Sequence, residues 1–165
     1  MARLIAATFS DDAFIMLWDE HDRPRSQLLG RAAAELADLR CRILRVSAKA
    51  AEELTVADLL SQVSDQAAAG AASGDLLERT HRLLTEVDAQ LDRVLLLIDH
   101  ADRLSSSAVR FLQLTSRSGP KLRVVLASTP TGAAHPAAPE LKVLAARSLK
   151  ISVGPSHAPL LRNVC

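Results

Sequence analysis

Short continuous apolar runs alternate along the chain with longer segments whose apolar residues recur every three or four positions. The runs predict buried strands, and the periodic segments predict amphipathic helices packed on them. The predicted strands are residues 13–18, 42–46, 94–98, 122–127 and 149–153. The predicted helices are residues 26–39, about 56–63, about 76–91, 106–116 and a short helix before the last strand. This alternation predicts an α/β fold, with a mostly parallel five-stranded sheet between two helical layers.

Weaker local signals complete the predicted order of elements. Residues 4–9 predict a short leading strand or a cap, and Thr55 is a candidate helix cap. The small-residue stretch AAAGAASG at 67–74 predicts a helix–helix connection rather than a domain linker. We therefore expect a single domain over residues 1–153, followed by a tail at 154–165 that is either disordered or a docking peptide.

Composition narrows the function classes more than it identifies one. The chain has 165 residues, a net charge of +1, 2% aromatic residues and no Tyr, which argues against direct binding of nucleic acid. Two distant cysteines and five histidines without paired spacing predict neither a disulfide framework nor a metal site. No apolar run is long enough to span a membrane, and no signal peptide precedes the domain, so we expect a cytoplasmic protein.

The connection between the first predicted strand and helix has the length of a phosphate-binding loop. Residues 13–18 (AFIMLW) are followed by DEHDRPRS, which aligns with the pattern GxxxxGK[ST]. Asp19 stands at the first Gly, Pro24 at the second, Arg25 at the Lys, and Ser26 keeps the hydroxyl. On spacing alone, a charged, proline-containing strand-to-helix loop without function is the favoured interpretation of these eight residues, and the features downstream reverse that preference.

The residue types in this connection oppose phosphate binding. A phosphate loop holds its ligand with converging backbone N–H groups, a helix N-terminus and a lysine. Pro24 has no N–H, and Asp19, Glu20 and Asp22 place negative charges where a polyanion would sit. Arg25 keeps a positive charge, but its planar guanidinium does not replace a compact ammonium. The sequence therefore predicts a degenerate nucleotide site.

A second motif follows 73 positions after Ser26. The run RVLLLID ends in Asp99, as in a Walker B strand, where the acid would hold Mg²⁺ through water. A buried strand that ends in a solvated Asp is the alternative. His100 stands where many ATPases carry a Glu that activates water, and imidazole does not reproduce a carboxylate beside Mg²⁺. We therefore expect no catalytic acid here.

The stretch VLLLIDHADRLSSSAVRFLQLTSRSGPKLRVVLASTP resembles the Walker B to sensor-1 region of AAA+ ATPases and their relatives. Within them it is most similar to the ExeA/GspA-type secretion ATPases and the STAND group. The resemblance covers residues 13–153 and implies a P-loop NTPase-like core without a helical lid domain. It places Ser128 or Thr129 at the sensor-1 position, which would contact the γ-phosphate or its attacking water. Arg147 is a candidate arginine finger toward a neighbouring subunit, although a surface Arg is the simpler interpretation.

These features favour a catalytically inactive, ATPase-like subunit of a larger bacterial assembly, such as a secretion or envelope-biogenesis complex. The expected partners are proteins, among them an active ATPase or a component of a membrane machine, in a homo- or hetero-oligomer. ATP and Mg²⁺ are not expected as cofactors. Two alternatives stay open: an active ATPase that uses Arg25, Ser26 and Asp99, or an inactive AAA+-like subunit of a DNA-associated complex.

Overall fold

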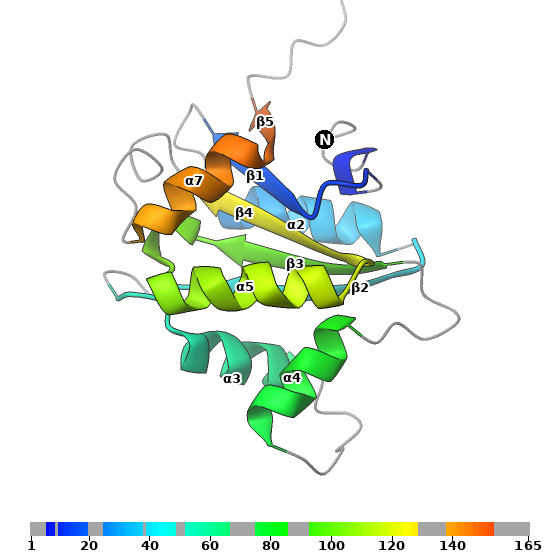
Figure 1. Ribbon diagram of the computed structural model, residues 1–165. Coiled ribbons are helices and arrows are strands. Elements are labelled where there is room, and N and C mark those ends of the chain that lie inside the picture. Colours follow the sequence, from blue (N-terminus) through cyan, green and yellow to red (C-terminus); the bar gives the residue numbers. More distant parts are fainter. Residues whose placement is uncertain are drawn as a thin grey trace, which may run out of the picture.

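The computed structural model describes residues 6–8, 10–19, 25–37, 39–48, 52–66, 75–85, 93–128 and 138–153. At its centre is a five-stranded sheet in the order β2-β3-β4-β1-β5, and all the strand pairs are parallel (Figure 1). The strands are β1 (Phe14–Asp19), β2 (Cys41–Ser47), β3 (Arg93–Asp99), β4 (Leu122–Ser128) and β5 (Leu149–Val153). The predicted parallel five-stranded sheet is confirmed.

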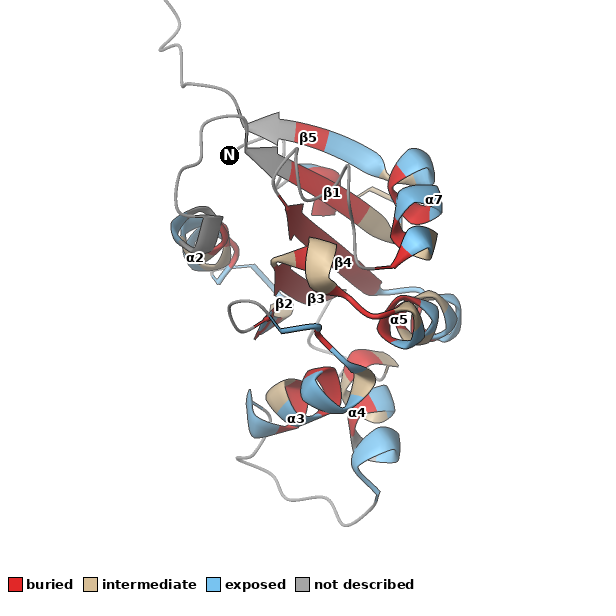
Figure 2. Cartoon of the chain, turned by 90° about the vertical axis from the view of Figure 1, so that its left-hand side faces the viewer, coloured by how far each residue is buried: buried red, intermediate tan, exposed pale blue. Residues whose placement is uncertain are grey.

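Helices cover both faces of the sheet, which confirms the three-layer α/β/α fold. One face carries α2 (Arg25–Leu36). The other carries four helices, α3 (Val56–Gln66), α4 (Leu76–Thr85), α5 (Ser106–Ser118) and α7 (Pro139–Arg147), and a short 3₁₀ turn, η1 (Ala101–Arg103). Figure 2 shows α2 on one side of the sheet and α4, α5 and α7 on the other. The described part of the chain contains no separate helical lid.

The strand sequences explain why the sheet is buried on both faces. In β3 the side chains of Val94, Leu96 and Ile98 belong to the core under α5, whereas Leu95 and Leu97 belong to the core under α2. All five are almost inaccessible to water. Successive residues of a strand point to opposite faces, so an uninterrupted apolar run fills two cores at once.

Two helix starts are fixed by side chains in the connecting loops. The predicted cap at Thr55 is present: its Oγ1 accepts from the Asp58 amide at 3.3 Å, and Asp58 Oδ2 accepts from the Thr55 amide at 3.0 Å. Ser105 caps α5 by accepting from the Ala108 amide at 3.1 Å. Each cap satisfies an amide that the helix itself leaves unpaired.

The edge strand β2 is covered by two glutamine side chains from α3. Gln62 bonds the amide and the carbonyl of Ser47 at 3.0 and 3.1 Å. Gln66 bonds both backbone groups of Arg45 in the same way. The two side chains stand four residues apart on one helix face, so they match alternate residues of the strand and protect an edge that would otherwise be free to pair.

Some predicted boundaries shift. Residues 6–8 are helical, so the leading strand predicted at 4–9 is wrong for them, in keeping with the high helix propensity of alanine at Ala6 and Ala7. The first long helix ends at Leu36 rather than 39, and α3 extends to Gln66. The predicted connection at 67–74, residues 129–137 and the predicted tail at 154–165 lie outside the described residues.

None of the helices in the described ranges is long and apolar enough to cross a membrane.

Candidate functional site

The carboxyl ends of three neighbouring strands bring the predicted site residues to one edge of the sheet. Asp99 ends β3, Ser128 ends β4 and Asp19 ends β1. Strand β4 lies between the other two, with Trp18 paired to Ser128 and Ile98 paired to Leu126. In open α/β sheets ligands bind at this carboxyl edge.

The candidate phosphate loop leaves the same edge. Strand β1 ends at Asp19 and α2 begins at Arg25, with Ser26 in its first turn. The predicted succession of strand, short connection and helix is therefore present. Pro24 lies outside the described residues.

Asp99 is the buried carboxylate of the edge, with 6% of its surface exposed. Its Oδ1 accepts a hydrogen bond from the backbone amide of the next residue, His100, at 2.9 Å. By the alternation along β3 it lies on the α2 face, where it lines a groove of about 340 Å³ with Leu29, Arg45 and Ser47. A buried carboxylate needs such donors because burial otherwise disfavours its charge.

His100 turns the chain with an unusual backbone conformation. Its φ of 54° and ψ of 45° place it in the left-handed region, where it precedes the η1 turn. Among the described residues it is the only non-glycine with a positive φ. L-residues pay about 1–2 kcal/mol for this conformation. The side chain makes no capping hydrogen bond to η1.

Ser128 is held by a partner that the sequence did not single out. Its hydroxyl is fully buried and donates to Asp102 Oδ1 at 2.8 Å. The bond ties the end of β4 to the η1 turn that follows β3. Asp102 belongs to the DHAD stretch. The sequence feature that could have identified it is a second acid three residues after Asp99.

Asp99 and Ser128 share the edge but lie on opposite faces of the sheet. Leu122, Val124 and Leu126 of β4 belong to the core under α5, so Ser128 also lies on that face. Asp99 lies on the α2 face, in register with Leu95 and Leu97. The structure thus brings the Walker B-like acid and the sensor-like hydroxyl to the same edge without aiming them at one point.

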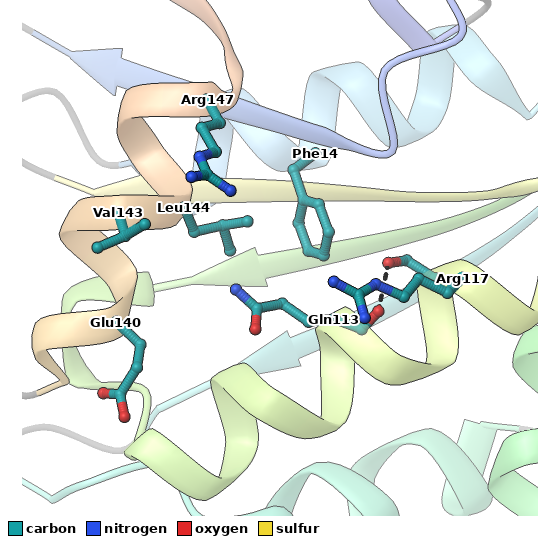
Figure 3. Close-up of a pocket in the computed structure, with 8 residues that line it drawn as sticks. Phe14, Gln113, Arg117, Glu140, Val143, Leu144 and Arg147 are labelled. Carbon is teal, nitrogen blue, oxygen red and sulfur yellow. Dashed lines mark hydrogen bonds between the residues drawn. The ribbon is translucent and has the colours of Figure 1, made fainter.

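Arg147 is far from this edge within its own chain. It ends α7, two residues before β5 begins, and in Figure 3 it lies beside Phe14, the first residue of β1. Parallel strands all start at the amino edge, so Arg147 and Asp99 lie at opposite ends of the sheet. Any contact of Arg147 with a site of this kind therefore requires a second subunit.

Metal ligands are sparse in the described ranges. No group of three or more His, Cys, Asp or Glu side chains there is placed to hold a metal ion. At the edge itself, Asp99 is a described carboxylate that could contribute to a cation site beside a bound nucleotide. The acids at 19, 20 and 22 and the proline at 24 fit a polyphosphate poorly as residue types.

Comparison with known proteins identifies a fold rather than a family. No protein-family model matches the sequence, and no curated protein matches it. Two solved structures of the Aeropyrum pernix ORC2 protein are similar, one described as ADPNP-ADP complexes and the other as the ADP form. Both superpose with a TM-score of 0.58, at 15% and 12% identity.

The similarity covers 92% of this chain and 44% of the ORC2 chain, so this chain spans less than half the length of that protein. At this identity the similarity shows a P-loop NTPase-like fold, and membership of the AAA+ group stays a prediction. The finer resemblance to ExeA/GspA-type or STAND ATPases stays a prediction.

Proposed function

We propose that this chain is a catalytically inactive, ATPase-like domain that serves as a protein-interaction subunit of a larger assembly. The observation that carries the proposal is the connection between β1 and α2. Asp19, Pro24 and Arg25 occupy it where a phosphate loop has Gly, Gly and Lys. A fold can outlast its chemistry when its surfaces still bind partners.

The chemistry of the edge supports the proposal in two further ways. His100 stands in place of a catalytic Glu, with its backbone turned left-handed. The hydroxyl of Ser128 donates to Asp102, on the face opposite Asp99. These features disfavour a site organised around a nucleotide and its attacking water.

The resemblance to secretion ATPases extends the proposal to the setting. We place the domain in the cytoplasm of a bacterium, as a structural or regulatory subunit beside an active ATPase or a membrane-machine component.

Calorimetry with ATP and with ADP in the presence of Mg²⁺ tests the loss of nucleotide binding. The ORC2 structures are described as nucleotide complexes, which makes these the ligands to use. We expect no heat of binding up to millimolar nucleotide. Micromolar affinity would overturn the proposal and favour an active site built from Arg25, Ser26 and Asp99, whose turnover Asp99→Ala should then abolish.

A restored loop makes the test reciprocal. The triple variant Asp19→Gly, Pro24→Gly, Arg25→Lys returns the turn glycines, one N–H group and the ammonium. We expect its nucleotide affinity to rise at least tenfold, about 1.4 kcal/mol. Arg31→Lys, an exposed position of the same helix, is the matched control and should leave affinity unchanged. A restored chain that still binds nothing would show that residues beyond this loop exclude the nucleotide.

A further inference from the structure

Helix α5 lies between α4 and α7 on the side of the sheet opposite α2, and a groove runs along each of its flanks (Figure 2). We call the outer surface of these three helices the helical face. The two grooves differ in charge. Neither groove includes any residue of the carboxyl edge.

The groove between α5 and α7 is basic. It has a volume of about 400 Å³, and Phe14 and Leu144 form its apolar wall (Figure 3). Arg117 and Arg147 are exposed at its rim, and neither makes a hydrogen bond or ion pair within the described part of the chain. The one acid that lines it, Glu140, already accepts bonds from Ser106 and Arg110, so the two guanidinium groups are left without a counter-charge.

The groove between α4 and α5 is apolar with an acidic rim. It has a volume of about 500 Å³, and Leu77, Phe111 and Leu114 line it. Asp75 and Glu78 stand at its edge on α4. Glu78 pairs with Arg82 along α4 at 2.9 Å, whereas Asp75 makes no hydrogen bond or ion pair within the described residues.

The helical face also concentrates exposed apolar side chains. Leu114 is 63% exposed, Val143 54% and Leu77 47%, the three highest values among the large hydrophobic side chains of the described residues. Leu77 and Leu114 line the acidic-rimmed groove, and Val143 lines the basic one. Exposed apolar side chains gathered on both flanks of one helix, with charged groups beside them, favour an interaction surface.

We infer that a second copy of this chain covers the helical face, related to the first by a twofold axis parallel to α5. Rotation about such an axis exchanges the two flanks of α5 but keeps positions along the helix. The basic groove lies beside residues 113–117 of α5, and the acidic-rimmed groove beside residues 111–118. The rotation therefore sets the flank with Arg117 and Arg147 of one copy opposite the flank with Asp75 of the other, and the two Leu114 side chains lie on either side of the axis.

A second copy covers both grooves at once, because its acidic-rimmed groove faces the basic groove of the first copy and its basic groove faces the acidic-rimmed one. Twofold contacts of this self-complementary kind are the commonest in homo-oligomers. The inference rests on the proposed function and deepens it, because it names a second copy of the chain as one partner of the interaction subunit. The dimer itself can be measured independently of nucleotide binding.

Sedimentation equilibrium of the full chain is the first test. We expect a concentration-dependent species of twice the 17.7 kDa of one chain. Leu114→Asp should weaken the association at least tenfold, because it buries a charge at the centre of the contact. Leu39→Asp, at an exposed leucine away from the helical face, is the matched control and should leave the dimer intact. A chain that stays monomeric at the highest soluble concentration would overturn the inference.

A charge exchange tests the geometry. Asp75→Lys alone and the pair Arg117→Glu, Arg147→Glu alone should each be monomeric, because like charges then face each other twice. Mixed together they should form a heterodimer, in which one contact is native and the other is inverted. Circular dichroism establishes that each variant is folded. Failure of the mixture to associate, or dimers of either variant alone, would overturn this arrangement of the dimer. A micromolar nucleotide affinity would overturn the proposed function and leave the dimer unaffected.

Discussion

The polar groups of the carboxyl edge are bonded within the chain, whereas those of the helical face are exposed to water. At the edge, Asp99 accepts from its neighbour's amide and Ser128 donates to Asp102, both within the chain and almost out of water. On the helical face, Arg117, Arg147 and Asp75 are exposed without a hydrogen bond or ion pair in the described residues, beside apolar side chains that face water.

The difference indicates where binding is still expected. A hydroxyl that already donates inside the protein, as that of Ser128 does, must lose that partner before it donates to a ligand, which costs about the energy of the hydrogen bond. Groups that face water without a partner carry no such cost. The carboxyl edge, which carries the nucleotide-like motif, is therefore less ready to bind a partner than the helical face, where the sequence analysis singled out Arg147.

The largest expected effect separates the two sides of α5. Leu112 is fully buried under the helix, whereas Leu114 is 63% exposed. Leu112→Ala should lower the free energy of unfolding by about 2–5 kcal/mol, because it leaves a cavity in the core. Leu114→Ala, the same substitution two residues on, should change it by less than about 0.5 kcal/mol. Urea denaturation of dilute protein measures both, and equal losses would mean that Leu114 is a core residue.

The bond at the end of β4 should be the next in size. Ser128→Ala removes the donor to Asp102, and we expect the free energy of unfolding to fall by about 1–2 kcal/mol. Ser116→Ala removes a hydroxyl that bonds a carbonyl within α5 at 3.0 Å and should cost less than about 0.5 kcal/mol. Chemical denaturation compares the two. If Ser128→Ala leaves the free energy of unfolding unchanged, the bond to Asp102 does not hold the Ser128 hydroxyl of the natural chain, and that hydroxyl is available to a ligand.

His100→Gly should raise the free energy of unfolding by about 1 kcal/mol, because glycine adopts the left-handed conformation without steric cost. His100→Val should lower it instead, since a β-branched residue is strained at this φ. Thermal unfolding of the three chains gives the order. Were the glycine variant destabilised, the imidazole would be making a contact that offsets its backbone strain.

The smallest effect concerns pH on the α5–α7 contact. The bond from Ser106, followed by Glu140's own backbone amide and Arg110, lowers the pKa of Glu140 below its ordinary value of 4.5. A lowered pKa in the folded state means that the contribution to stability is present above about pH 4.5 and is lost as the pH falls through the lowered value.

Glu140→Gln should therefore flatten the fall in stability between neutral and acidic pH, and leave the rest of the profile unchanged. Denaturation midpoints at a series of pH values between 3 and 7 measure the slope. Identical slopes in the two chains would show that Glu140 does not titrate differently on folding.

The sequence predicted the elements well where the physics is local. Uninterrupted apolar runs marked β3 and β4 because a strand buried on both faces has no polar position. Thr55 was recognisable as a candidate cap because its hydroxyl directly precedes the helical pattern that begins at Val56. The strand–loop–helix order around Asp19 and Arg25 was also readable from residue spacing alone.

What the sequence could not show depends on contacts between distant segments. Leu114 stands out in the sequence merely as one more leucine of a helix, and its exposure follows from how α4, α5 and α7 pack. The pairing of Ser128 with Asp102 joins residues 26 positions apart. Residues 6–8 were assigned wrongly because two alanines and a threonine carry too little periodicity to separate a helix from a strand.

By itself, then, the sequence determined the order and type of the long elements, the sheet's two-sided burial and the altered chemistry of the connection after β1. These features depend on hydrophobic periodicity and residue type, which involve residues close together in the sequence. The tertiary structure alone decided that β4 separates β1 from β3, that Asp99 and Ser128 lie on opposite faces, and that two grooves of opposite charge flank α5. Those outcomes depend on strand order and helix packing, which are set by the fit of the whole core rather than by any one segment.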